Sequence, residues 1–366
     1  MVSSVSNPVP GFGEPAPFFT AETDGVPNYS FEVAAGRWIV LMAFGSLTAA
    51  ESAHGHAEAM RRRALFDDAN ASFFGVSVDR ADREVRGLHN NGAVRYFWDF
   101  DQAVCRRWGL IDGQYLRPGL FLIDRALRVV MAEPIERAAA VLDQLEATLA
   151  AERQEAEAPL APVLTLPNVF EPEFCAELID HFERAGGKQS GFAQDIDGVT
   201  VDLVDARFKR RLDVFIEDQA LAAEARSRLT SRLVPMVRRA LGWQATEIER
   251  DLICRYDAGD SGFFSAHRDE ATAGTAHRKF AVTVNLNAGD YEGGALRFPE
   301  FGRRTYAPPT GGATVFCCSL LHEVTPVSRG RRYCFVPFLY DAEGARLRRA
   351  NLSKVAHADR RAGRRR

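Results

Sequence analysis

The stretch LICRYDAGDSGFFSAHRD, residues 252–269, joins two apolar runs of strand length through a turn that contains two glycines. The pattern continues to residue 340, with short β-rich runs separated by glycine and proline turns. Such spacing is typical of an antiparallel sandwich or barrel. The expected strands are 252–256, 263–266, 280–286, 295–298, 314–318 and 333–339. We therefore predict that the second half of the chain is mainly β.

Two helical segments precede these strands. In the first, at 172–185, apolar residues stand four apart and form one stripe of a helix. These residues are Phe174, Leu178 and Phe182. The second segment, at 218–241, repeats the spacing and contains Pro235, which we expect to kink or interrupt the helix. The β-rich unit is thus expected to have flanking helices.

The first half alternates apolar strand-length runs with helical segments. WIVLMAF at 38–44 and SFFGVSV at 72–78 enclose a helical segment at 53–68. Strands that are apolar on every residue are typical of a sheet covered on both faces. Further expected elements are a polar helix near 81–89, strands at 95–100, 119–123 and 128–132, and a helix at 135–150. We predict an α/β sheet with helices packed on both sides.

A domain boundary is expected at 151–162, where Ala, Glu and Gln lead into two prolines and little can be buried. We predict a first domain at 8–150, a linker at 151–162, a second domain at 163–342 and a basic tail at 343–366. The tail is interpreted as a solvated, frayed terminus rather than a binding arm.

Composition narrows the classes of function. The 366 residues are 46% hydrophobic, enough for two ordinary cores, and the formal net charge is −3, which argues against nucleic acid as a partner. No apolar run reaches the roughly 18–20 residues of a membrane span, and the N-terminus lacks the pattern of a signal peptide. The six cysteines show no C-x-x-C spacing and are expected to be reduced. We expect a cytoplasmic protein with no membrane partner.

A candidate metal site lies in the β-rich half. His267 and Asp269 are two residues apart, so on a strand they face the same side, and His322 follows 55 residues later. Two imidazoles and one carboxylate leave three positions of a metal open, the arrangement used for non-heme Fe(II) and O2 chemistry. The H-x-D pair alone is weak evidence for a metal site, because a chain with eight histidines can contain such a pair by chance.

Arg332 strengthens this interpretation, since it lies ten residues after His322. If the two residues lie on adjacent antiparallel strands joined near Gly330, the guanidinium enters the cavity that holds the metal. A planar, permanently charged group there suits bidentate capture of a carboxylate. Arg331 faces the opposite side of the same strand, so only one of the two arginines can enter, and Arg332 is the preferred candidate.

Seven short motifs follow one another in the second half. They are RYDAG at 255–259, FSAHRD at 264–269, TVNLN at 283–287, YEGGALRF at 291–298, GGA at 311–313, HEVTPV at 322–327 and GRR at 330–332. In this order they resemble the iron(II)- and 2-oxoglutarate-dependent dioxygenases of the prolyl 4-hydroxylase type. The resemblance covers residues of about 163 to 342.

This resemblance implies a double-stranded β-helix, or jelly roll, in which His267, Asp269 and His322 hold Fe(II). It implies that Arg332 pairs with the distal carboxylate of 2-oxoglutarate. Tyr256 matches a tyrosine that commonly touches this cosubstrate, although a core aromatic residue is an equal alternative. The implied reaction is hydroxylation of an amino-acid side chain, free or in a peptide, or of a related small molecule, with release of succinate and CO2. Ascorbate is an open candidate as the reductant that keeps the iron ferrous.

The first half also resembles a known family. GEPAPF at 13–18, WIVLMAF at 38–44 and RPGLFLID at 117–124 are similar to the thioredoxin-like fold of peroxiredoxins. That family places its reactive cysteine after the first buried strand, near a helix N-terminus. Here FGSLTAAES at 44–52 contains no cysteine, and Cys105 falls on a later expected helix. The domain is expected to lack peroxidase activity and to dock a protein partner or position a substrate.

Two alternatives to an oxygenase remain open. One is a noncatalytic binding or scaffold protein in which both halves are degenerate. The other is a peroxide-responsive protein that senses oxidants through Cys105. The sequence identifies neither the substrate nor the oligomeric state. Other residues are interpreted as structural rather than functional. His277 is expected to be a loop histidine, and His54 with His56 a surface pair at the start of a helix. Cys317 with Cys318 are expected to be core thiols, and Gly293 with Gly294 to form a tight turn.

Overall fold

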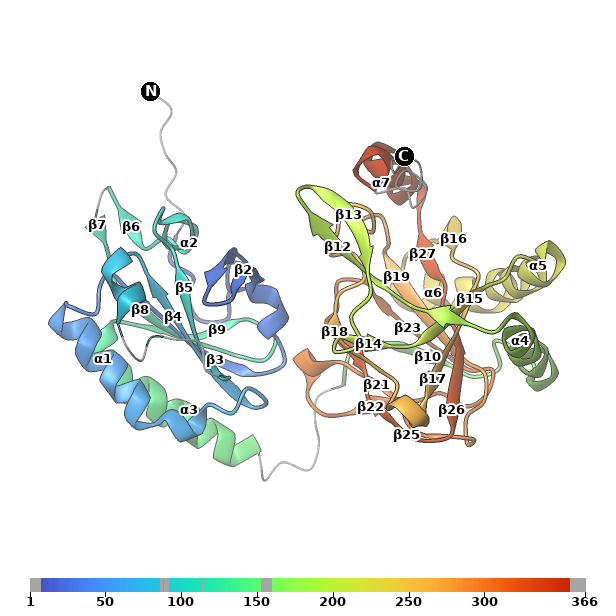
Figure 1. Ribbon diagram of the computed structural model, residues 1–366, viewed down its shortest axis with the longest axis horizontal. Helices are drawn as coiled ribbons and strands as arrows, with labels where there is room; N and C mark the ends of the chain where they lie inside the picture. The colour runs from blue at the N-terminus through green and yellow to red at the C-terminus, as the bar shows by residue number, and fades with distance from the viewer. Residues whose placement is uncertain (1–7, 86–87, 89–91, 114, 153–159, 356–366) are drawn as a thin grey trace, which may run out of the picture. The chain divides into compact units, whose positions relative to one another are not determined.

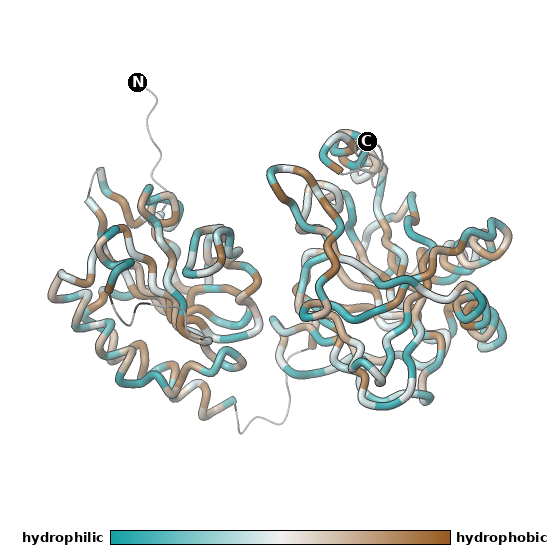
Figure 2. The backbone as a smooth tube through the Cα atoms, in the orientation of Figure 1, coloured by the Kyte–Doolittle hydropathy of each residue, from teal (hydrophilic) through white to brown (hydrophobic). Residues whose placement is uncertain are grey.

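The computed structural model describes residues 8–85, 88, 92–113, 115–152 and 160–355 (Figure 1). The chain forms two compact units that divide near residue 160. Most of the expected linker, 153–159, lies outside the described residues. Each unit has its own hydrophobic core. Figure 2 shows hydrophobic segments in the strands of each unit and hydrophilic residues on the outer turns of its helices.

The first unit is built on a seven-stranded sheet with the order β2-β1-β5-β4-β3-β8-β9. Its strands are β1 (Thr20–Thr23), β2 (Val26–Ser30), β3 (Trp38–Phe44), β4 (Ala71–Ser77), β5 (Val94–Trp98), β8 (Gly119–Ile123) and β9 (Val129–Glu133). Its α-helices are α1 (Ala50–Arg61), α2 (Ala103–Arg107) and α3 (Ala138–Glu152). Strands β3, β4 and β5 run parallel, and β8 pairs antiparallel with β3. The predicted α/β class is confirmed.

Side chains from this sheet pack on both of its faces. Val40 and Met42 of β3 belong to a buried cluster that includes the apolar stripe of α3. On the other face, Phe31 and Phe121 pack edge-on against Trp108, with ring centroids 6.1 and 4.9 Å away. Covering both faces explains why these strands are apolar at successive positions.

The second unit contains two larger antiparallel sheets. The nine-stranded sheet follows the path β10-β23-β19-β26-β17-β15-β11, with β27 pairing both β19 and β16, and the five-stranded sheet has the order β14-β18-β24-β21-β22. The strands of the first are β10 (Leu164–Leu166), β11 (Lys188–Gln189), β15 (Leu212–Phe215), β16 (Glu247–Glu249), β17 (Leu252–Asp257), β19 (Phe280–Asn285), β23 (Ala313–Cys317), β26 (Arg331–Phe335) and β27 (Phe338–Tyr340). Those of the second are β14 (Lys209–Arg210), β18 (Phe263–His267), β21 (Leu296–Arg297), β22 (Thr305–Tyr306) and β24 (His322–Val324). The predicted sheet-rich fold is confirmed.

Helix α4 (Pro172–Ala185) coincides with the predicted segment, and its apolar stripe packs in the core shared with β17 and β26. The segment 218–241 is interrupted as its proline predicts. It divides into α5 (Gln219–Arg228), a π-helical turn (Leu229–Leu233) and α6 (Val234–Leu241). Pro235 lies in the first turn of α6, where its missing N–H leaves no hydrogen bond unmade.

Alternation along β17 and β26 separates this helix layer from an internal cavity. Ile253 and Phe335 belong to the core that includes α4, while Cys254 and Cys334 line the cavity between the sheets. Successive residues of a strand point to opposite faces. The helices therefore cover one face of the nine-stranded sheet, and the other face is left to form a site.

The C-terminal expectation is partly wrong. Residues 342–351 form α7 (Ala342–Asn351), and the Asp341 carboxylate caps this helix by accepting a hydrogen bond from the Gly344 N–H at 2.8 Å. The Asn351 side chain donates a hydrogen bond to the Ala273 carbonyl at 2.9 Å, and this contact holds the end of α7 against the rest of the second unit. Only 356–366 of the predicted tail lies outside the described residues.

Two local expectations in the first unit also need correction. The polar helix expected near 81–89 is a short 3-10 turn, Arg80–Glu84, and part of that range lies outside the described residues. His56 is half-buried rather than a surface residue: its Nε2 lies 2.7 Å from the Tyr96 hydroxyl, and burial lowers the pKa of His56. The neighbouring His54 is exposed as expected.

Candidate metal centre

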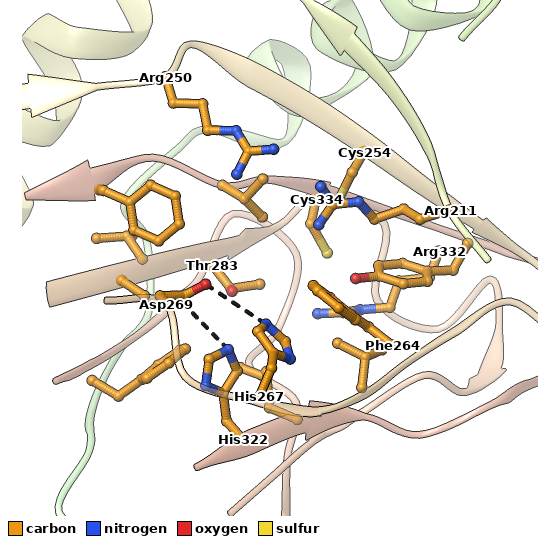
Figure 3. A pocket seen from close by; sticks show the side chains of 18 residues that line it. Arg211, Arg250, Cys254, Phe264, His267, Asp269, Thr283, His322, Arg332 and Cys334 are labelled. Carbon is orange, nitrogen blue, oxygen red and sulfur yellow. Dashed lines mark ion pairs between the residues drawn. The ribbon is translucent and has the colours of Figure 1, made fainter. Parts of the chain in front are cut away.

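Three candidate ligands lie close together at the adjacent ends of two strands, β18 and β24, in the five-stranded sheet. Strand β18 ends at His267 and β24 begins at His322, and these two residues are register partners. Asp269 follows β18, and its N–H donates to the Cys318 carbonyl at 3.0 Å. One ligand atom from each of His267, Asp269 and His322 lies within 4.8 Å of the others (Figure 3). The structure therefore brings the predicted triad together.

The spacing of these donor atoms suits a divalent metal ion. The Asp269 carboxylate oxygens lie 3.6 Å from His267 Nε2 and 3.4 Å from His322 Nε2. Nitrogen and oxygen ligands bind transition metals at about 2.0–2.2 Å, so neighbouring ligands stand roughly 3 Å apart. A small inward movement of the side chains is enough to enclose an ion. Within the described residues, this is the group of metal-ligating side chains that is close enough to hold one.

The second nitrogen of each histidine is occupied by the backbone. His267 Nδ1 lies 2.7 Å from the Ser265 carbonyl, and His322 Nδ1 lies 3.0 Å from the Leu320 carbonyl. A carbonyl only accepts, so each Nδ1 donates and each Nε2 keeps its lone pair for a metal. These contacts hold both rings with Nε2 directed at Asp269.

The protonation states are those that bind a cation. Burial, reinforced by His267, lowers the pKa of His322 to about 4, so its imidazole is neutral at pH 7. Burial opposes ionisation of Asp269, but the neighbouring His322 and His267 hold the pKa of that carboxyl well below its usual range. Neutral imidazole and ionised carboxylate are the ligand forms that bind metals.

Arg332 reaches the same cavity from the opposite sheet. It pairs in register with Tyr256 across β26 and β17, and its guanidinium carbon lies 5.6 Å from the centre of the Tyr256 ring. Both side chains line the cavity with the metal triad. Arg332 is 2% exposed, and in the described part of the chain no carboxylate forms an ion pair with it. A buried guanidinium without a counter-ion is costly, and an anionic ligand compensates it.

The predicted route from His322 to Arg332 is wrong. The two residues do not lie on adjacent strands, because β24 belongs to the five-stranded sheet and β26 to the nine-stranded sheet. Between them, β25 (Val327–Arg329) pairs with β20 (Glu292–Gly293). The nine intervening residues therefore cross from one sheet to the other, which places the guanidinium and the triad on facing walls of the cavity.

The neighbouring Arg331 lies outside the cavity. Its side chain is 54% exposed, and its Nε donates to the Asp257 carboxylate at 2.8 Å. This separation follows from the alternation of strand residues.

Sequence reasoning gave no role in the site to several residues that line the cavity, among them Arg211, Arg250, Phe264 and Thr283. Arg211 is buried and pairs with Asp213, with Nε to Oδ1 at 2.6 Å. The sequence Lys209-Arg210-Arg211 is typical of a charged surface segment. Only Asp213, two positions after Arg211, indicates that Arg211 could form a buried ion pair. Phe264 and Thr283 each begin a motif quoted from the sequence, but Arg250 lies between two strands and no local pattern marks it.

Other residues considered from sequence stay outside the site. His277 lies in a loop as expected, but it is buried, and its Nε2 lies 3.0 Å from the Glu249 carboxylate. Burial raises the pKa of the Cys318 thiol, as for a core residue. Gly293 and Gly294 have positive φ, and a Cβ on Gly293 would lie 2.2 Å from the Pro326 carbonyl oxygen. The glycine pair thus serves close backbone approach.

The first unit lacks a reactive thiol at the position where peroxiredoxins have one. Ser46 and Thr48 occupy that loop, with their hydroxyls 2.8 Å apart. Cys105 lies on α2 and is fully buried, and burial together with the Asp99 carboxylate raises its pKa. The thiolate form that reacts with peroxide is therefore disfavoured.

Comparisons with known proteins define the class of each unit. Residues 252–340 match the 2OG-Fe(II) oxygenase superfamily, and residues 12–132 match the AhpC/TSA family. A PKHD-type hydroxylase from Burkholderia ambifaria is 31% identical over 178 residues, which cover 46% of this chain and 73% of that protein. The chain belongs to the 2OG-Fe(II) oxygenase superfamily and carries an AhpC/TSA-type, thioredoxin-like domain before its oxygenase domain.

Two further comparisons are more limited. A PKHD-type hydroxylase from a Synechococcus strain is 35% identical over 94 residues, 24% of this chain, and the chain spans about two fifths (41%) of that relative's length. A Pseudomonas putida prolyl-4-hydroxylase structure has a TM-score of 0.39 and 19% identity, and the match covers 53% of this chain and 98% of that one. None of the described helices has the length and apolar character needed to cross a membrane.

Proposed function

We propose that the second unit, with domain limits of about 163–342, is an Fe(II)- and 2-oxoglutarate-dependent dioxygenase. One observation carries this proposal. A triad of two imidazoles and one carboxylate shares a cavity with Arg332, a buried guanidinium that has no carboxylate partner among the described residues. The triad suits a cation with open positions, and the arginine suits the far carboxylate of a dicarboxylic acid.

Each group of residues in the cavity has a separate proposed role. His267, Asp269 and His322 would hold Fe(II), and the backbone contacts of the two histidine rings keep both Nε2 atoms available for the metal. Arg332 binds the distal carboxylate of 2-oxoglutarate, and Tyr256 lies against that guanidinium. Bound Fe(II) and 2-oxoglutarate supply the activation of O2. Apolar lining residues exclude water from the reacting atoms, and they include Ala281, Leu296, Phe316 and Val324.

The proposed reaction is hydroxylation of an amino-acid side chain, free or in a peptide, or of a related small molecule. One oxygen atom of O2 enters the substrate, and the other enters succinate as 2-oxoglutarate loses CO2. The relative named as a PKHD-type hydroxylase supports hydroxylation as the reaction. Ascorbate is proposed as the reductant that keeps the iron ferrous between turnovers.

Formation of succinate tests this function. We expect the purified full chain to convert 2-oxoglutarate to succinate when Fe(II), O2 and ascorbate are present, slowly without substrate and faster with it. Omitting Fe(II) or O2 should reduce succinate to background in mass spectrometry. Succinate formation that continues in metal-free protein treated with a chelator would contradict the assignment.

A substitution at Gly294, whose backbone packs against the Arg332 side chain, tests whether the position of Arg332 matters for cosubstrate binding. Gly294 has φ of +62°, and a Cβ there would lie 3.0 Å from Arg332 Cδ and 2.8 Å from Val327 Cγ2. Gly294→Ala should therefore displace the guanidinium and raise the 2-oxoglutarate concentration for half-maximal turnover by about fivefold or more. Gly289→Ala is the matched control, because Gly289 has φ of +96° and no atom within 4 Å of the added Cβ.

Both variants carry a similar backbone cost of about 1 kcal/mol, which should appear as a similar loss of thermal stability. Only Gly294→Ala should change the cosubstrate requirement. Equal 2-oxoglutarate requirements in the two variants would show that the Gly294 contact does not position Arg332.

For the first unit, at 8–150, we propose a role without thiol-peroxidase activity, in docking a protein partner or positioning a substrate. The missing cysteine in the loop after β3 supports this proposal. The burial of Cys105 argues against the alternative of a peroxide sensor that acts through this thiol.

A further inference from the structure

A second arginine enters the cavity with the triad. Arg250 lies between β16 and β17 and lines the same cavity as Asp269, His267 and Arg332. Figure 3 shows its guanidinium pointing into this space from a different side than Arg332. The proposed metal and cosubstrate assignments give Arg250 no function.

The guanidinium of Arg250 is not satisfied by the protein. It forms no hydrogen bond among the described residues, and its nearest carboxylate oxygen, Asp213 Oδ2, lies 3.5 Å away. That carboxylate is already held by Arg211, with Nε to Oδ1 at 2.6 Å and a terminal nitrogen to Oδ2 at 2.7 Å. The side chain of Arg250 is 23% exposed, so its donors are accessible from the cavity. Two arginines therefore share one carboxylate, and Arg250 is the one left with free donors.

The other nearby charges do not supply a partner either. The positive charges of Lys209 and Arg250 each act to lower the pKa of Asp202, but within the described residues neither side chain lies within 4.0 Å of its carboxylate as an ion pair. Lys209 is buried, and its Nζ donates to the Gly191 carbonyl at 2.6 Å. Neither Lys209 nor Asp202 therefore forms a direct ion pair with the Arg250 guanidinium within the described residues.

The backbone at Arg250 is unusual for a side chain of this size. Its φ is +74°, in the left-handed region that residues with a Cβ rarely adopt. Such strain persists where the surrounding structure enforces it, and it clusters at functional sites. Here the left-handed residue directly follows β16, and its guanidinium points into the cavity (Figure 3).

Bound metal and cosubstrate would still leave this charge uncompensated. The two charges of Fe(II) would be balanced by Asp269 and one carboxylate of 2-oxoglutarate, and Arg332 would be balanced by the other carboxylate. Arg211 is balanced by Asp213. Arg250 then remains as one partly buried cation beside the reacting centre. Burial, with Arg211 and Arg278 nearby, lowers the pKa of Arg250 to about 10, so it is still charged at pH 7.

We propose that Arg250 binds an anionic group of the primary substrate, so that this enzyme hydroxylates an acid whose carboxylate or phosphate pairs with Arg250 while a neighbouring carbon faces the metal. This inference rests on the proposed dioxygenase function and names the class of its substrate. A guanidinium pairs with carboxylate and phosphate through the same charge-assisted hydrogen bonds, so both groups share the required chemistry.

Capped single residues are suitable probes. The full chain with Fe(II) and saturating 2-oxoglutarate is titrated without oxygen, and the change in its visible charge-transfer band reports probe binding. The probes are N-acetyl amides of aspartate, phosphoserine and asparagine, of which the last is the neutral isostere of the first. We expect at least one acid to bind about 10- to 100-fold more tightly than the asparagine probe. The better of the two acids identifies the group.

Variants of Arg250 connect this preference to the residue. Arg250→Gln should abolish the preference for the acid, and Arg250→Lys should retain part of it, because only the lysine keeps the charge. Arg331→Gln, which removes an exposed guanidinium, should behave as wild type. In each variant the charge-transfer band itself shows that metal and cosubstrate are still bound.

The outcomes are distinguishable. Equal response to acid and amide, no response to either acid, or an acid preference that survives in Arg250→Gln would each overturn the inference. A band that weakens in Arg250→Gln at saturating 2-oxoglutarate would also overturn it, since Arg250 would then serve the cosubstrate. Absence of any band in wild type would instead contradict the proposed dioxygenase function.

Discussion

Asp269→Ala is expected to abolish 2-oxoglutarate-dependent succinate formation, with a loss of at least about 100-fold. Asp269 supplies the single negative charge among the proposed ligands, and both imidazoles converge on its carboxylate at 3.4 and 3.6 Å. Removing it leaves two neutral nitrogens, which hold a divalent cation weakly. His267→Ala should have a similar effect. Succinate is measured by mass spectrometry with Fe(II), 2-oxoglutarate and ascorbate in excess.

The matched control is Asp260→Ala, which removes an exposed carboxylate from the turn between β17 and β18. This variant should keep wild-type turnover and wild-type metal content after dialysis. All variants should also melt within a few degrees of wild type in metal-free buffer, which separates loss of a ligand from loss of the fold. Undiminished succinate formation in Asp269→Ala would refute the assignment of the triad.

Arg332→Met should raise the 2-oxoglutarate concentration for half-maximal turnover by about 100-fold, while turnover is partly recovered at high cosubstrate. The reason is the loss of a buried, bidentate partner for the distal carboxylate, which costs about 2–5 kcal/mol of binding. Arg332→Lys should be intermediate, because it keeps the charge and loses the planar fork. Initial rates against 2-oxoglutarate concentration give the comparison.

Arg331→Met is the control for this series, since it changes the adjacent arginine on the exposed side of the same strand. It should leave the 2-oxoglutarate requirement within about twofold of wild type, as expected for an exposed ion pair. If Arg331→Met raised the requirement and Arg332→Met did not, the roles assigned to the two arginines would have to be exchanged.

Local patterns in the sequence predicted several elements closely. The stripe through Phe174, Leu178 and Phe182 located α4, and Pro235 located the break before α6. The strand alternation that separates Arg331 from Arg332 also follows from the sequence, because it depends only on neighbouring residues. Features of this kind are readable because their causes lie within a few residues.

Features that depend on contacts between distant segments were missed. The crossing of the chain between the two sheets after His322 is caused by pairing of β25 with β20, more than thirty residues earlier. No motif surrounds Arg250, and its role depends on Asp213 of β15 and on Arg211, which directly precedes that strand. Helix α7 was taken for a frayed tail because its charged residues hid the Asp341 cap and the Asn351 contact.

The iron site is tested most directly by an anaerobic titration of the full chain with Fe(II) and 2-oxoglutarate, followed by visible spectroscopy. We expect a weak charge-transfer band in wild type that saturates at one iron and one 2-oxoglutarate per chain and is absent in His267→Ala. No band in wild type, or an equal band in His267→Ala, would contradict the claim that His267, Asp269 and His322 form the iron site of a dioxygenase.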